Sequence, residues 1–124
     1  MSSCAYAMPA TISYVVDGDT FNAVAHMGNG TDVDVRVRLA NIDTPEMNGK
    51  CESEMRRANA ARERLRNLIP RGAIVELKNI KDDKYLGRID ANVILPDGRD
   101  AGRVLINEKL GRPYSGGKRA GWCE

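Results

Sequence analysis

The feature that most restricts the fold is the strict alternation of apolar and charged side chains over residues 32–39. Because successive side chains of a β-strand point to opposite faces, this pattern predicts a half-buried strand. Its core-facing residues are Val33, Val35, Val37 and Leu39. Arg38 is therefore expected on the face away from the core. Residues 88–95 repeat the alternation and place Arg88 on the corresponding outer face.

The remaining elements follow from similar patterns. β-branched and aromatic residues predict strands over 11–17, 20–27 and 73–80, and helical periodicity predicts helices over 51–69 and 100–110. The apolar stripe expected on the first helix consists of Cys51, Met55, Ala58, Leu65, Leu68 and Ile69. Three strands, a helix and two strands are the order of the OB-fold, a five-stranded Greek-key barrel. We therefore expect an α+β OB-fold β-barrel with two or three helices over residues 11–124, after an N-terminal tail of residues 1–10.

Two short motifs carry the chemistry, Asp17-Gly18-Asp19-Thr20 and the segment from Arg38 to Glu46. Carboxylates in loops are typical ligands of a hard divalent cation. A cation site has no use for an arginine unless an anion such as phosphate lies between the metal and the guanidinium. The motifs together indicate chemistry on a phosphodiester. We expect Asp17 to hold the turn through backbone N–H groups.

Three blocks of the chain resemble the staphylococcal nuclease family, in the family's order. They are Val16-Asp17-Gly18-Asp19-Thr20-Phe21, Val37-Arg38-Leu39 through Ile42-Asp43-Thr44-Pro45-Glu46, and Asp83-Lys84-Tyr85-Leu86-Gly87-Arg88. The resemblance runs from about Thr11 to Leu110. It implies the OB-fold and a calcium-dependent nuclease of low sequence specificity, acting on single-stranded or frayed DNA and RNA.

The resemblance also implies roles for individual residues. Asp19 and Asp43 would bind one Ca²⁺ through carboxylates, and Thr44 through its carbonyl. Glu46 would be the general base, and Arg38 and Arg88 would stabilise the charge that develops on the phosphate. The substrate-binding loop would consist of Asp83, Lys84 and Tyr85, and Tyr114 is a further candidate for an aromatic contact.

Leu86 departs from the family pattern, in which Tyr is followed directly by Gly. One extra residue inside a strand would reverse the facing of Arg88. We expect the loop before Gly87 to absorb it.

Two other functions compete with hydrolysis. A catalytically silent member of the family would bind nucleic acid or protein without cutting, but such domains generally lose the carboxylates and arginines that this chain retains. A calcium-buffering or structural domain would explain the acidic residues and leave Arg38 unexplained.

The cysteines and the N-terminal residues bear on localisation. Cys51 opens the predicted first helix and Cys123 follows the basic, glycine-rich segment, so the two either form a disulfide, as suits an exported protein, or remain free thiols. Ala5 and Ala7 resemble the end of a signal peptide, although a flexible tail explains them equally well. No apolar run reaches the roughly 20 residues that span a bilayer. We expect a monomer that is secreted or that resides in the periplasm or cell envelope.

Overall fold

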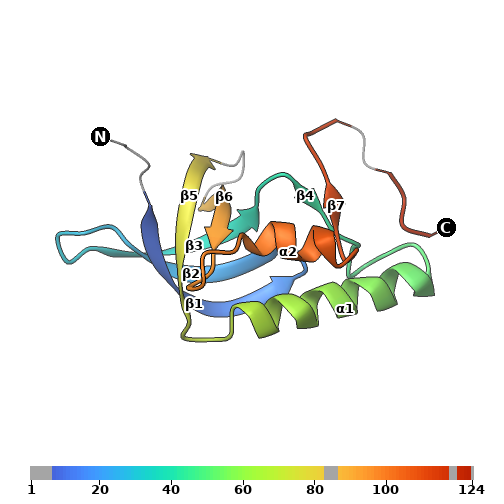
Figure 1. Ribbon diagram of the computed structural model, residues 1–124, viewed down its shortest axis with the longest axis horizontal. Coiled ribbons are helices and arrows are strands. Elements are labelled where there is room, and N and C mark those ends of the chain that lie inside the picture. The colour runs from blue at the N-terminus through green and yellow to red at the C-terminus, as the bar shows by residue number, and fades with distance from the viewer. Residues whose placement is uncertain (1–6, 83–86, 118–119, 124) are drawn as a thin grey trace.

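The computed structural model of the protein describes residues 7–82, 87–117 and 120–123. Within this part of the chain, five strands close into a barrel in the order β1-β2-β3-β6-β5 (Figure 1). These are β1 (Met8–Asp17), β2 (Thr20–His26), β3 (Asp32–Leu39), β5 (Ile74–Asp82) and β6 (Arg88–Ile94). Neighbouring strands pair antiparallel except β3 and β6, which are parallel. The predicted α+β, five-stranded OB-fold barrel is confirmed.

Two helices and a small second sheet complete the described structure. Helix α1 (Glu52–Leu68) runs along one side of the barrel and α2 (Ala101–Asn107) lies beside it (Figure 1). Arg64 of α1 donates to both carboxylate oxygens of Glu108, each at 2.8 Å. Strands β4 (Ile42–Asp43) and β7 (Arg112–Pro113) pair antiparallel outside the barrel. No helix in the described residues is long and apolar enough to cross a membrane.

The core fills the barrel and the space beneath α1. Along each barrel strand, every second side chain points inward, and these side chains pack against one face of α1. One apolar cluster therefore connects the barrel with the helices. Its largest fully buried side chains include Ile12, Phe21, Leu39, Ile42, Leu65, Ile69, Leu77 and Leu105.

The ends of several elements differ from the prediction. Strand β1 begins at Met8 and pairs with β5 from there, so residues 8–10 belong to the barrel and not to the expected tail. Helix α2 ends at Asn107 instead of residue 110, because Lys109 adopts a left-handed backbone with φ +64°. Strands β4 and β7 were not predicted, since two residues carry no periodicity.

Two side chains expected in the core are exposed. The β2–β3 hairpin extends beyond the barrel (Figure 1), which leaves Val33 41% exposed despite its place in the alternation. Met55 is 38% exposed, whereas Glu54, the residue before it, is buried. Helical periodicity identified the correct helix but the wrong residue at its N-terminal end.

Candidate functional site

The turn between β1 and β2 is tight and pressed against its neighbours. Asp17 accepts a hydrogen bond from the backbone N–H of Asp19 at 3.1 Å, in agreement with the turn-holding role expected of it. A Cβ at Gly18 would lie 2.7 Å from Cβ of Ala61 in α1 and 3.1 Å from Oγ1 of Thr44. Only glycine fits there, and this contact brings the Asp19 turn against the segment that follows β4.

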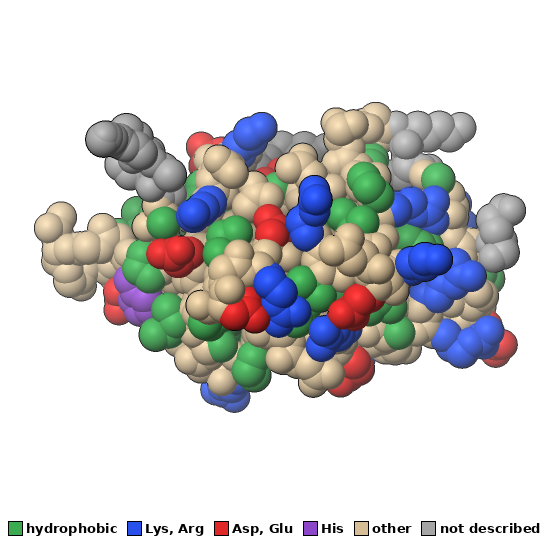
Figure 2. Space-filling view, in the orientation of Figure 1, with side chains coloured by type: hydrophobic (Ala, Val, Ile, Leu, Met, Phe, Trp, Pro, Cys, Tyr) green, Lys and Arg blue, Asp and Glu red, His purple; other side chains and the backbone are tan. Residues whose placement is uncertain are grey.

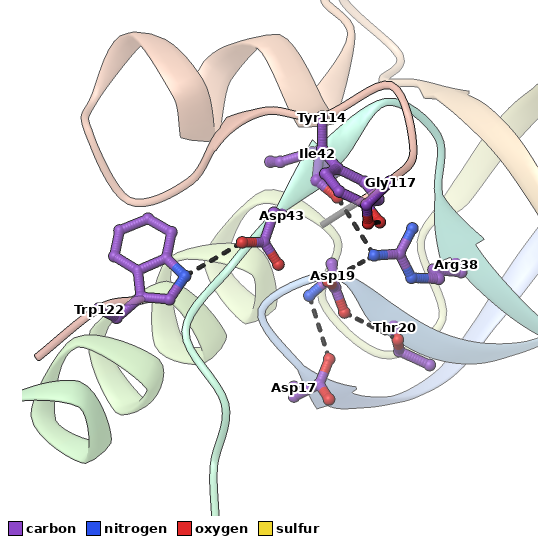
Figure 3. A network of polar contacts seen from close by, with 9 residues as sticks. All are labelled: Asp17, Asp19, Thr20, Arg38, Ile42, Asp43, Tyr114, Gly117 and Trp122. Atoms are coloured by element: carbon purple, nitrogen blue, oxygen red, sulfur yellow. Dashed lines mark hydrogen bonds and ion pairs between the residues drawn. The ribbon is translucent and has the colours of Figure 1, made fainter. Parts of the chain in front are cut away.

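The carboxylate of Asp19 is buried, in surroundings that disfavour its ionised form. Asp19 is 8% exposed, accepts a hydrogen bond from Thr20 Oγ1 at 2.9 Å, and lies 3.5 Å from Nη2 of Arg38 (Figure 3). Burial and the neighbouring Asp17 raise its pKa to about 6, and Arg38 and Thr20 only partly oppose this shift. A carboxylate that is expensive to ionise alone gains most from a bound cation, so Asp19 fits a calcium ligand.

We expect the burial of Asp19 to be visible in the pH dependence of stability when no divalent cation is present. The pKa of Asp19 is about 6 in the folded protein, whereas its ordinary value, 3.8, applies to the unfolded chain. Between these two pH values the folded protein therefore holds a proton that the unfolded chain has lost. The resulting stabilisation is complete below about pH 4 and is lost as the pH rises through about 6. The loss should be about 1–3 kcal/mol.

Urea unfolding in a chelator, compared between wild type and Asp19→Asn across this pH range, measures that loss. The free energy of unfolding of wild type, relative to that of Asp19→Asn, should fall as the pH rises. Parallel pH profiles would show that Asp19 ionises normally.

Asp43 and Thr44 lie at the second strand pair. Both are 2% exposed, and Asp43 lies opposite Arg112 in the β4–β7 pairing. Asn41, with φ +64°, makes the tight turn that leads from β3 into β4. In Figure 3 the carboxylates of Asp43 and Asp19 project into the same region, from β4 and from the β1–β2 turn. The structure thus brings together the two carboxylates that the sequence predicted as cation ligands.

The two arginines share one face of the barrel. In the parallel β3–β6 pair, Arg88 lies opposite Arg36, two residues before Arg38 on the same face. The N–H of Arg36 donates to the carbonyl of Gly87 at 3.1 Å, which fixes this register. Arg88 therefore lies on the same face of the sheet as Arg38, as period-two alternation predicted. Leu86 itself lies outside the described residues.

Arg38 is held by partners on two sides. Besides Asp19, its Nη2 donates to the carbonyl of Ile42 at 3.3 Å (Figure 3). Its side chain is 19% exposed, so the guanidinium is anchored and still reachable from solvent. This arrangement suits an oxyanion placed between the arginine and a cation.

Glu46 lies on the loop after β4, with an exposed side chain. The loop is held by Glu54 of α1, whose carboxylate accepts from the backbone N–H of Glu46 and of Lys50, each at 3.1 Å. Sequence reasoning missed Glu54. The signal was present, because Glu54 follows the helix N-cap Cys51 by three residues, which is capping-box spacing.

The predicted substrate-binding residues are only partly described. Asp83, Lys84 and Tyr85 lie outside the described residues. Tyr114 is half-buried, its N–H donates to the carbonyl of Asn41 at 3.0 Å and its hydroxyl to Gly117 at 2.7 Å. It lies beside Ile42 and Arg38 in Figure 3, at the edge of the candidate site.

The C-terminal segment contributes a residue that sequence reasoning did not place. Trp122 is 7% exposed, and its indole N–H donates to Oδ2 of Asp43 at 3.2 Å. A disulfide joins the next residue, Cys123, to Cys51, which is the pairing that the sequence left open against free thiols. A tryptophan beside a cysteine in a polar segment was the available signal.

Comparison with known proteins adds one finding. A family model described as "Staphylococcal nuclease homologue" matches residues 36–118, about two thirds of the chain. No curated protein matches. The matched range contains Arg38, Asp43, Glu46 and Arg88, and it excludes the Asp17–Thr20 turn and Trp122.

Proposed function

Because the chain belongs to the staphylococcal nuclease homologue family, we propose that it is a calcium-dependent nuclease that hydrolyses phosphodiester bonds of DNA and RNA with low sequence specificity. One observation carries the proposal. Asp19 lies in the β1–β2 turn and Arg38 on β3, yet their charged groups are 3.5 Å apart, beside the buried carboxylate of Asp43. A protein that only buffers calcium has no use for a guanidinium there, whereas a phosphate ester needs both charges.

The residues present fit a calcium ion. Asp19, Asp43 and the carbonyl of Thr44 would hold it, because calcium prefers oxygen ligands and tolerates loose geometry. The high pKa of Asp19 is the supporting observation, since a cation would relieve the cost of its ionisation. When bound, calcium supplies charge neutralisation at a phosphate oxygen and favours deprotonation of water.

The chain's own residues supply the rest of the reaction. Glu46 would accept a proton from the attacking water while the oxygen of that water forms its bond to phosphorus. The bond from phosphorus to the 5′-oxygen breaks, the 5′-oxygen leaves with the electron pair and takes a proton from solvent, and a 3′-phosphate remains. Arg38 and Arg88 would donate to the oxygens on which charge develops, which is the role that a rigid, permanently charged fork performs best.

The surface is compatible with a polyanionic substrate. Basic side chains are spread over the face in Figure 2 and gather at its right-hand end, over the first half of α1 and the segment after β7. Such a surface attracts single-stranded or frayed nucleic acid without reading bases. Asp83, Lys84, Tyr85 and Tyr114 are proposed to contact the nucleotide.

We place the protein outside the reducing cytoplasm, as a secreted or periplasmic monomer. The Cys51–Cys123 disulfide supports this location, because such bonds persist in oxidising compartments.

Incubation of the pure protein with single-stranded DNA, in calcium or in a chelator, tests the function. We expect cutting in calcium, none in the chelator, and products that end in 3′-phosphate. Binding without any change in DNA length would favour a silent binding module. Calcium binding without any affinity for nucleic acid would favour a structural calcium domain.

A further inference from the structure

The segment after β7 returns to the candidate cation site and contacts it through Trp122. This residue, the only tryptophan of the chain, donates its indole N–H to Oδ2 of Asp43 at 3.2 Å (Figure 3). An ionised carboxylate has about four lone-pair sites, so a carboxylate that accepts one hydrogen bond can still bind a cation. The indole therefore orients Asp43 without displacing a cation from it.

Trp122 is itself held on two sides. The guanidinium of Arg112 lies 3.6 Å from the centroid of the indole ring and also donates to the carbonyl of Gly121 at 2.7 Å. On the other side, Cys123 is bonded to Cys51, with 6.0 Å between the two Cα atoms. Trp122 is 7% exposed.

The same disulfide adjoins the loop that carries Glu46. Cys51 is the N-cap of α1, and its sulfur accepts from the backbone N–H of Glu54 at 3.3 Å. The carboxylate of Glu54 in turn holds the backbone N–H of Glu46. The disulfide is thus connected to both parts of the site. Through Trp122 it adjoins Asp43, and through Glu54 it adjoins the loop that carries Glu46.

We propose that Trp122 is a positioning residue for Asp43 and that the Cys51–Cys123 disulfide keeps it there, so that the affinity of the site for calcium depends on this disulfide. Donors to a metal-binding carboxylate fix its orientation, and their loss typically costs about 10–100-fold in affinity. The inference rests on the proposed function in that Asp43 is taken as a calcium ligand.

Calcium affinity, measured by titration calorimetry, is the primary test. We compare oxidised wild type, wild type reduced by a dithiol, and oxidised Trp122→Phe, which keeps an aromatic ring and the disulfide but loses the indole N–H. Reduction converts the disulfide to two thiols while the dithiol supplies two electrons and two protons and becomes a cyclic disulfide. Both altered forms should bind calcium about 10–100-fold more weakly. Tyr14→Phe, an exposed aromatic changed in the same way, should bind as wild type.

The outcomes separate this inference from the proposed function. If oxidised wild type binds calcium and the altered forms bind it equally well, the positioning role is wrong and the nuclease proposal is untouched. If oxidised wild type binds none, the proposed cation site fails and the positioning role fails with it. Tighter calcium binding after reduction would mean that the segment carrying Trp122 hinders the cation, and this result would also overturn the inference.

A second measurement needs no cation. Trp122 is the sole source of tryptophan fluorescence, so reduction should shift the emission to the red as the ring enters water. The double variant Cys51→Ser with Cys123→Ser should emit like the reduced protein, and serine retains the N-cap of α1. Circular dichroism verifies that each form is folded. An unchanged emission from folded protein in which Cys51 and Cys123 are both free thiols would show that the disulfide does not hold Trp122.

Discussion

Glu46→Gln is expected to lower kcat by about 10²–10⁴-fold, because glutamine has nearly the shape of glutamate and cannot accept the proton of water. KM for a short single-stranded DNA should change little. The fold should tolerate the substitution, since the side chain is exposed and the loop is held through the backbone N–H of residue 46, which glutamine keeps. Steady-state cleavage of a fluorescent oligonucleotide and anisotropy binding without turnover measure the two quantities.

Glu52→Gln is the matched control for this prediction. Glu52 is an exposed carboxylate in the first turn of α1, paired with Arg56 at 3.7 Å. Its loss should leave both kcat and binding as in wild type. Equal rates for the two variants would remove Glu46 from the mechanism, and a loss of binding without a loss of kcat would place it in substrate recognition.

Arg38→Lys is expected to lower kcat by about 10²–10³-fold. Lysine keeps the positive charge but loses the planar fork that can donate two parallel hydrogen bonds to a phosphate. Arg38 also pairs with Asp19 and with the carbonyl of Ile42, so some loss of stability is expected. The kinetics are therefore measured well below the unfolding temperature of the variant, which thermal denaturation determines.

Arg36→Lys provides the comparison from the same strand and the same face. Arg36 is exposed and donates from Nε to the side chain of Asn22 at 2.8 Å, away from Asp19. Its substitution should reduce affinity for nucleic acid only slightly, as expected for a general basic surface, and leave kcat unchanged. If the two lysine variants lose kcat to the same extent, Arg38 has no special place at the scissile phosphate.

Much of the fold was available from local patterns. Alternation over residues 32–39 and 88–95 identified the two strands that lie parallel in the barrel, and it predicted the outward face on which Arg38 and Arg88 lie. Alternation succeeds here because the facing of a strand residue depends only on its neighbours along the chain. It failed at Val33, where the hairpin leaves the barrel and has no core to face.

The candidate site was predictable in part. Asp19 and Asp43 were recognisable from short motifs, because tight turns and loop carboxylates have characteristic residues. Glu54 was harder to interpret, since an acid on a helix is usually solvated. Its burial follows from the loop N–H groups that need an acceptor there.

The sequence by itself determined the order of the five barrel strands and the two helices, the face of the charged residues on β3 and β6, and the motifs that contain the carboxylates, because these depend on residues a few positions apart. Only the tertiary structure decided that Trp122 donates to Asp43 from 79 residues away, and that Cys51 and Cys123 meet. Those contacts arise where β7 pairs with β4 and the segment after β7 reaches the N-cap of α1. Contacts between segments so far apart in the chain leave no periodic trace in either segment. The sequence offered only the two cysteines, with a tryptophan beside one of them, and left their pairing open.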